Sequence, residues 1–227
     1  MALRIALAQL NLLVGDIEGN AGRIMTAAER ARDEQQADLI VFPELTLTGY
    51  PPEDLLLRPA CDRRVAKALQ EIASAAIGIT LVVGYPALRN GVRYNLAGVL
   101  RDGVFGVEYL KVKLPNYSVF DEPRYFEPGA NALVFSQGGT RFGVSICEDI
   151  WFDMPVQRAA AVAAVAVVPV VGEPRKRTKT EKWTKARSHL TRSYSSCHPA
   201  RGEGFPRVPR LSMLRVIWVS MLNRFVA

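Results

Sequence analysis

The sequence has only two histidines, and neither lies in its first 171 residues. Both, His189 and His198, fall near the C-terminal end. A Cys–His or Ser–His–Asp triad therefore cannot be built in the longer part of the chain, because each needs an imidazole as its base. The chain also lacks a Gly-x-Ser-x-Gly motif and a Gly-x-x-x-x-Gly-Lys-Ser/Thr loop, so nothing in it indicates nucleotide binding.

Long apolar runs and paired cysteines are also missing. No stretch approaches the roughly 20 apolar residues of a membrane-spanning helix, and residues 1–10 alternate like a strand and have no signal-peptide cleavage site. The three cysteines, Cys61, Cys147 and Cys197, are far apart and lack metal-ligand spacing, which argues against a disulfide framework. We therefore predict a soluble cytoplasmic protein without a membrane partner, whose cysteines act as thiols.

The net charge of +7 comes from the C-terminal end. Residues 172–227 contain 13 of the 29 Lys/Arg and 3 of the 22 Asp/Glu, so residues 1–171 hold 16 basic and 19 acidic side chains. The C-terminal part is rich in Arg, Ser and Pro and lacks a sustained amphipathic period, so we do not expect a nucleic-acid partner. We predict a folded domain at 1–171 and a basic tail of no recognisable fold at 172–227.

The longer part follows the strand–helix–strand rhythm of an α/β layer fold. Expected strands lie at 3–8, 38–42 and 79–83, with helices at 20–36 and 62–76. Two antiparallel pairs are expected next, at 94–100 with 104–109 and at 132–135 with 141–146. A helix at 157–164 and a strand at 165–171 complete the pattern. Helices should therefore cover a mixed sheet.

Three residues that follow predicted strands could perform nucleophilic catalysis without an imidazole: Glu44, Lys111 and Cys147. A carboxylate in a poorly solvated pocket can take a thiol proton, and a nearby cation favours the thiolate and stabilises an oxyanion. Taken singly, each residue has an ordinary explanation. Glu44 could be a capping carboxylate, Lys111 a solvated lysine and Cys147 a small buried thiol.

The motifs around these residues connect the three. The chain order Glu44, Lys111, Cys147 resembles the nitrilase, or carbon-nitrogen hydrolase, superfamily. Four segments resemble the glutaminase domain of glutamine-dependent NAD(+) synthetases: FPELTLTGYPPEDL (42–55), KVKLPNY (111–117), VFDEPRYF (119–126) and ICEDIW (146–151). The resemblance implies the family's fold class, an α/β four-layer α-β-β-α sandwich, here incomplete at its C-terminal end.

The resemblance also implies a mechanism. Glu44 takes the proton of Cys147, whose sulfur attacks the side-chain amide carbon of glutamine. Lys111 and the backbone N–H of Glu148 hold the developing oxyanion. Ammonia leaves, and water activated by Glu44 releases glutamate from the thioester.

The supporting residues follow from the same resemblance. The family places two residues between its catalytic lysine and a Leu-Pro pair, which selects Lys111 rather than Lys113. Glu122 is expected to orient Lys111 and the substrate, and Tyr117 to form a wall of the pocket. The amidase step implies no cofactor and no metal.

The same family carries a C-terminal synthetase domain that acts on deamido-NAD(+) with ATP and magnesium. The family's Ser-Gly-Gly-x-Asp-Ser loop is nowhere in these 227 residues. The resemblance holds to about residue 160, and we interpret the switch to Arg/Ser/Pro-rich sequence as a frameshift near that point. The expected partners are glutamine, a synthetase domain supplied elsewhere and, because family members assemble through this domain, further copies of the chain.

Two alternatives stay open. The chain could be a free-standing nitrilase-family amidase for another small amide, although the segments 50–54 and 114–117 favour the first reading. It could also be an inactive fragment or a basic binding protein. Glutaminase activity abolished by Cys147→Ala would eliminate the last alternative, whereas salt-sensitive nucleic-acid binding lost on deleting 172–227 would support it.

Overall fold

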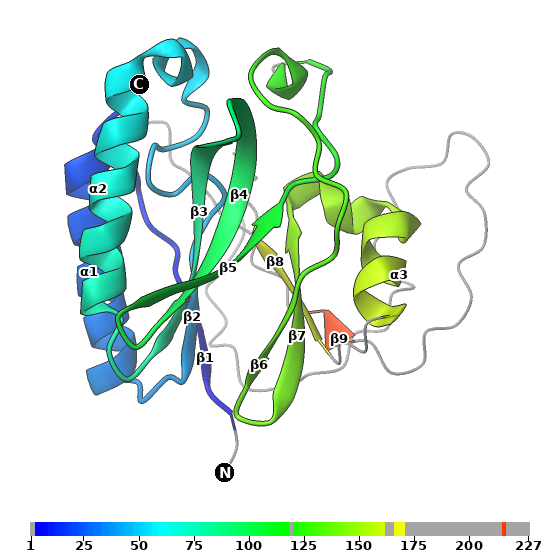
Figure 1. Cartoon of the computed structure of the whole chain (residues 1–227). Helices are drawn as coiled ribbons and strands as arrows, with labels where there is room; N and C mark the ends of the chain where they lie inside the picture. Colours follow the sequence, from blue (N-terminus) through cyan, green and yellow to red (C-terminus); the bar gives the residue numbers. More distant parts are fainter. Residues whose placement is uncertain (1–2, 119, 162–165, 171–214, 217–227) are drawn as a thin grey trace, which may run out of the picture.

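The computed structural model describes residues 3–118, 120–161, 166–170 and 215–216, so the predicted tail lies outside the described residues apart from a two-residue strand. The described residues form four layers in the order helices, sheet, sheet, helix (Figure 1), as the resemblance implied. Their elements are β1 (Ile5–Leu7), α1 (Ile17–Asp33), β2 (Leu39–Val41), η1 (Glu53–Leu57), α2 (Pro59–Ala75), β3 (Thr80–Arg89), β4 (Val92–Arg101), β5 (Val104–Leu110), η2 (Glu122–Arg124), β6 (Val134–Gln137), β7 (Thr140–Ile146), η3 (Cys147–Trp151), α3 (Asp153–Ala161), β8 (Ala166–Val170) and β9 (Arg215–Val216).

The first sheet has the order β1-β2-β3-β4-β5. β1, β2 and β3 are parallel neighbours joined through α1 and α2, whereas β3, β4 and β5 form an antiparallel meander. β3 is twice as long as predicted because it continues into a hairpin with β4. The turn is Asn90-Gly91, whose φ angles of 53° and 79° match the left-handed residues of a type I′ hairpin turn.

Both faces of this sheet are covered, as the uninterrupted apolar run of β2 predicted. Leu39 and Val41 point toward the second sheet, and Ile40 and Phe42 toward α1 and α2; all four are at most 2% exposed. The strand alternation therefore separates two cores, one under the helices and one between the sheets.

Helix α1 begins earlier than the predicted start at residue 20. Asp16 caps it by accepting a hydrogen bond from the Gly19 N–H, at 3.1 Å. Asn20 is instead fully buried, and its amide donates to the carbonyls of Leu13 and Leu47, at 2.8 and 3.2 Å. Asn20 thus ties the helix to the turn that follows β2.

The second sheet has the order β6-β7-β8-β9, and α3 lies on its outer face (Figure 1). β6 and β7 form the predicted hairpin, and β8 confirms the strand expected at 165–171. α3 begins at Asp153, four residues before the run predicted at 157–164. Among the described residues, no helix is both long and apolar enough to cross a bilayer.

Candidate active site

The three predicted catalytic residues each follow the end of a strand. Glu44 follows β2, Lys111 follows β5, and Cys147 follows β7. Their exposed fractions are 1%, 0% and 6%. Since β2 and β5 belong to the first sheet and β7 to the second, the site lies where the two sheets face each other.

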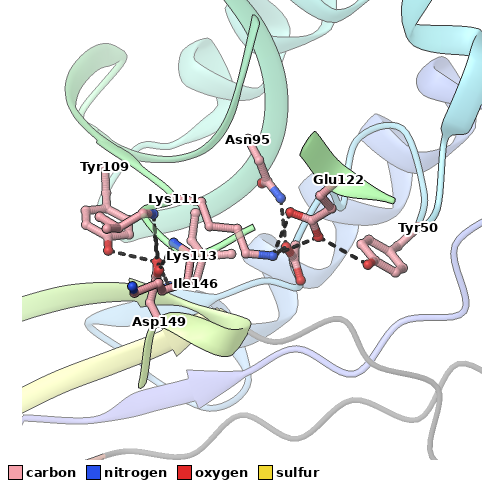
Figure 2. Close-up of polar contacts among 10 residues, drawn as sticks. Tyr50, Asn95, Tyr109, Lys111, Lys113, Glu122, Ile146 and Asp149 are labelled. Atoms are coloured by element: carbon pink, nitrogen blue, oxygen red, sulfur yellow. Dashed lines mark hydrogen bonds and ion pairs between the residues drawn. The ribbon is translucent and has the colours of Figure 1, made fainter. Parts of the chain in front are cut away.

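Lys111 contacts two carboxylates at once (Figure 2). Its Nζ lies 2.6 Å from Glu44 Oε1 and 2.8 and 2.9 Å from the two oxygens of Glu122. A buried ammonium is costly unless it is paired and hydrogen-bonded, and here both conditions are met. The structure therefore places Glu122 against Lys111.

Asn95 on β4 fixes the carboxylate of Glu44. Its Nδ2 donates to Glu44 Oε1 at 2.7 Å, and its backbone carbonyl accepts the Lys111 N–H at 2.9 Å. Oε1 is thus occupied by two donors, whereas the buried Oε2 has no hydrogen-bond partner in the described part of the chain. One carboxylate oxygen is held and the other is left to accept a proton.

The backbone next to two of these residues adopts an uncommon conformation. Cys147 has a φ of 46°, and Leu45, which follows Glu44, has a φ of 47°. The left-handed region costs a non-glycine residue roughly 1–2 kcal/mol, so the surrounding packing must hold it in place. Below the Glu44 turn, Leu47 donates its N–H to the Gly84 carbonyl at 3.2 Å. The turn therefore rests directly on β3.

The cluster has one more negative group than its single cation can balance. Burial and the charge of Glu44 raise the pKa of Glu122 to about 7, against the opposing effect of Lys111. Burial lowers the pKa of Lys111, but Glu44, Glu122 and a charge on Cys147 together raise it above its usual value. Lys111 therefore stays charged, whereas Glu122 exchanges its proton near neutral pH.

A third buried carboxylate, Asp149, lies near the backbone of Lys111 and Lys113 (Figure 2). It is 0% exposed and accepts hydrogen bonds from the backbone N–H groups of Val112, Lys113 and Ile146 and from the hydroxyl of Tyr109. Burial raises its pKa to about 6, although the hydrogen bond from the Lys113 N–H lowers it.

Glu148 and Tyr117 are the two residues expected to complete the substrate site. Glu148 is 9% exposed and belongs to the first turn of η3. Tyr117 is 48% exposed, and its ring packs edge-on against Phe120, with centroids 5.5 Å apart. The oxyanion contact and the pocket wall remain predictions for these residues.

A cavity of about 270 Å³ opens beside the cluster. Its lining includes Tyr50, Phe120 and Glu122. Tyr50 donates its hydroxyl to Glu122 Oε1 at 3.2 Å, and burial together with the nearby carboxylates and Cys147 raises its pKa. A larger hollow of about 560 Å³, between α2 and the β3–β5 strands, contains none of the clustered residues.

Three residues of the site were not singled out from the sequence: Tyr50, Asn95 and Asp149. Tyr50 and Asp149 lie inside two of the motif segments, but their partners are distant along the chain. Asn95 carried a usable signal, because a polar side chain within the apolar run of β4 must find a buried partner. Among the described residues, no group of three or more His, Cys, Asp or Glu side chains could hold a metal ion.

Comparison with known proteins decides the family. The sequence profile of the family described as Carbon-nitrogen hydrolase matches residues 4–197. The chain belongs to the carbon-nitrogen hydrolase family. The match continues past residue 160, where the recognisable motifs end, into residues that the structure does not describe.

Relatives of this carbon-nitrogen hydrolase include much longer proteins. It is 48% identical over 179 residues to the glutamine-dependent NAD(+) synthetase of Xylella fastidiosa (strain Temecula1), covering 78% of this chain and 33% of that protein. The structure of the glutamine-dependent NAD+ synthetase from Acinetobacter baumannii in complex with ADP matches with a TM-score of 0.74 and 41% identity, over 77% of this chain and 33% of the other. The chain thus spans about a third of the length of these relatives.

A shorter hydrolase has the same fold. The structure of an amidase from Nesterenkonia sp. AN1 matches with a TM-score of 0.67 and 31% identity, over 75% of this chain and 67% of the other. In another structure of that amidase, acrylamide has added to the active-site cysteine. These likenesses confirm the nitrilase-type sandwich predicted for the chain.

Proposed function

We propose that this carbon-nitrogen hydrolase releases ammonia from the side-chain amide of glutamine, for use in ATP-dependent synthesis of NAD(+) from deamido-NAD(+). The observation that carries the proposal is the buried contact of Lys111 with Glu44, next to Cys147. The identity to glutamine-dependent NAD(+) synthetases supports the choice of glutamine.

The first half of the reaction forms a thioester. The Cys147 thiol gives its proton to Glu44, whose Oε2 is the oxygen without a hydrogen bond among the described residues. The sulfur attacks the amide carbon, and the carbonyl electrons move onto oxygen. Lys111 and the Glu148 N–H stabilise that oxyanion. When the carbonyl re-forms, the C–N bond breaks, and Glu44 returns its proton to the departing ammonia.

The second half regenerates the enzyme. A water molecule gives a proton to Glu44 and attacks the thioester carbon, through a second oxyanion at the same position. The C–S bond then breaks, glutamate leaves, and the proton on Glu44 returns to the sulfur of Cys147. Glu44 and Cys147 are therefore unchanged after each cycle.

The proposal includes partners and conditions. The amidase step uses no cofactor, so we expect a chelator such as EDTA to leave it unchanged, whereas ATP and magnesium serve the synthetase domain that receives the ammonia.

We place the reaction in the cytoplasm and expect further copies of this chain to assemble with it through the amidase domain. Size-exclusion chromatography with light scattering would measure the assembly.

The direct test measures ammonia and glutamate from L-glutamine with the full chain. Cys147→Ala should reduce kcat at least 1,000-fold, because it removes the nucleophile. Cys61→Ala is the matched control, since Cys61 is a buried thiol on α2, and it should stay within about three-fold of the parent. Absence of glutamine hydrolysis by the parent chain, or hydrolysis that survives Cys147→Ala, contradicts the proposal.

A second candidate is an amidase that acts on another small amide. The match to two thirds of the Nesterenkonia amidase favours it. A panel of short aliphatic amides beside L-glutamine separates the two functions. Hydrolysis of the panel that depends on Cys147, with none of glutamine, would replace the first proposal by this one.

A further inference from the structure

Asp149 joins two segments that lie far apart in the sequence (Figure 2). Its Oδ1 accepts the N–H groups of Val112 and Lys113 at 3.1 and 2.6 Å, directly after Lys111. Its Oδ2 accepts the N–H of Ile146 at 3.3 Å, directly before Cys147. The same oxygen also accepts the Tyr109 hydroxyl at 2.8 Å and the Val112 N–H at 3.3 Å. One carboxylate thus holds the backbone on the C-terminal side of the lysine and on the N-terminal side of the cysteine.

Helix capping alone does not explain this arrangement. A cap on η3 needs only the Ile146 N–H, whereas the two shortest backbone contacts of Asp149 come from residues 36 and 37 positions away. Burying a carboxylate fully costs several kcal/mol unless its oxygens are satisfied, and a surface cap would avoid that cost. The position is therefore specific to a link between the two segments.

We propose that Asp149 is a positioning residue that fixes Lys111 Nζ relative to the sulfur of Cys147. The role in catalysis rests on the proposed amidase function, but the geometry does not. Lys111 extends from the backbone that Asp149 holds to the carboxylates of Glu44 and Glu122. A displacement of about 1 Å between reacting groups can reduce a rate roughly 100-fold, so the link matters without touching substrate.

Asp149→Asn in the full chain tests the role. An amide keeps one acceptor oxygen but places an NH2 group where Oδ2 now accepts the Ile146 N–H, so the contact with one segment is lost. We expect the rate of Cys147 alkylation by iodoacetamide, measured on its peptide by mass spectrometry, to fall 10- to 100-fold. Where glutamine is hydrolysed, kcat should fall by a similar factor with KM changed less than three-fold.

Two controls separate positioning from loss of structure. Tyr109→Phe removes the hydroxyl that donates to Asp149 at 2.8 Å but leaves all its backbone contacts, so Cys147 alkylation should stay within three-fold. Cys61, buried on α2, reports on the fold in the same digest. Cys147 alkylation in Asp149→Asn that is unchanged or faster, with Cys61 alkylation unchanged, overturns the proposal. Faster alkylation of both cysteines shows that the variant does not fold, and the parent chain then provides the test.

If Asp149→Asn does not fold, hydrogen exchange of the parent chain tests the proposal instead. The amides of Val112, Lys113 and Ile146 should then be as protected as those of β4, because they donate to a buried carboxylate. Exchange as fast as in exposed loops overturns the proposal. Alkylation needs no glutamine, so a parent chain that fails to hydrolyse glutamine defeats the proposed function and leaves the Asp149 test intact.

Discussion

Glu122 is placed where its protonation changes the properties of its neighbours. Its pKa of about 7 results from burial and from Glu44, which shares the same lysine. When Glu122 is ionised, Lys111 divides its charge between two carboxylates. When Glu122 is protonated, Lys111 keeps its ion pair with Glu44 alone, so the group that stabilises the oxyanion loses one of the two carboxylates that orient it.

At the residue scale, we therefore predict an acid limb in the pH dependence of kcat. The rate should fall as the pH decreases through about 7, an apparent value that belongs to the coupled cluster. Glu122→Gln cannot ionise, so its kcat should be about 10- to 100-fold lower at pH 8 and nearly flat between pH 6 and 8. The same acid limb in both proteins would refute the assignment to Glu122.

At the element scale, contact between β3 and the turn after β2 decides where Glu44 lies. A Cβ on Gly84 would lie 2.4 Å from the Pro43 carbonyl and 2.7 Å from the Leu45 nitrogen, both backbone atoms. Neither atom can move without displacing Glu44 between them. Glycine is required at position 84 because the two backbones approach each other closely.

Gly84→Ala should therefore displace Glu44, the proposed catalytic base. We expect a loss of at least 10-fold in kcat and a decrease of roughly 1–3 kcal/mol in the free energy of unfolding, measured by urea denaturation. Gly22→Ala in α1 is the control, because nothing lies within 4 Å of its added Cβ. That variant should keep its activity and gain up to about 1 kcal/mol. Equal behaviour of the two variants contradicts this account.

Local signals explain which elements could be predicted from the sequence. Strands β1 to β8 were expected from alternation, from apolar runs and from the turns between paired segments, and the strand-to-cysteine junction of β7 followed directly. The two-residue β9 was not expected, because residues 172–227 were predicted to have no recognisable fold. The β3–β4 hairpin was not predicted, although Asn90-Gly91 carries a strong hairpin signal. The Asp149 contacts could not be predicted, because they depend on where the chain between β5 and β7 returns.

At the scale of the whole molecule, two buried carboxyls make stability depend on pH. The folded-state pKa of Glu122 is raised from 4.5 to about 7, and that of Asp149 from 3.8 to about 6. A raised folded pKa means that the folded protein binds the proton more tightly. The stability that these two bound protons contribute is fully present below about pH 4 and is lost as the pH rises through 6 and 7.

The melting temperature should thus decrease from pH 5 to pH 8. One pKa unit corresponds to about 1.4 kcal/mol, so these shifts amount to roughly 2–4 kcal/mol over that range, or about 5–10 °C for a domain of this size. Glu122→Gln should flatten the decrease in differential scanning fluorimetry. A melting temperature that rises between pH 5 and 8 would show that the carboxyls are not held protonated by the fold.

The coding sequence offers another test at this scale. The chain spans about a third of its synthetase relatives. The resemblance to the synthetase family implies a Pro-Asn-Ala-Ser-like loop that helps to hold glutamine, beyond the point where the motifs end. We predict that resequencing from about codon 150 to well past the stop, with translation in three frames, reveals this loop and then a Ser-Gly-Gly-x-Asp-Ser motif. If no frame contains them, the frameshift interpretation is wrong, and the basic C-terminal residues belong to an authentic short amidase.

The burial of the Lys111 cluster also predicts how dissolved ions affect the reaction rate. The proposed cycle depends on Lys111, Glu44 and Glu122, whose charged side chains are at most 6% exposed. Mobile ions screen charges only where solvent reaches them. The chemical step therefore proceeds without an ionic atmosphere, and its rate should be the same in dilute buffer and in concentrated salt for as long as the fold persists.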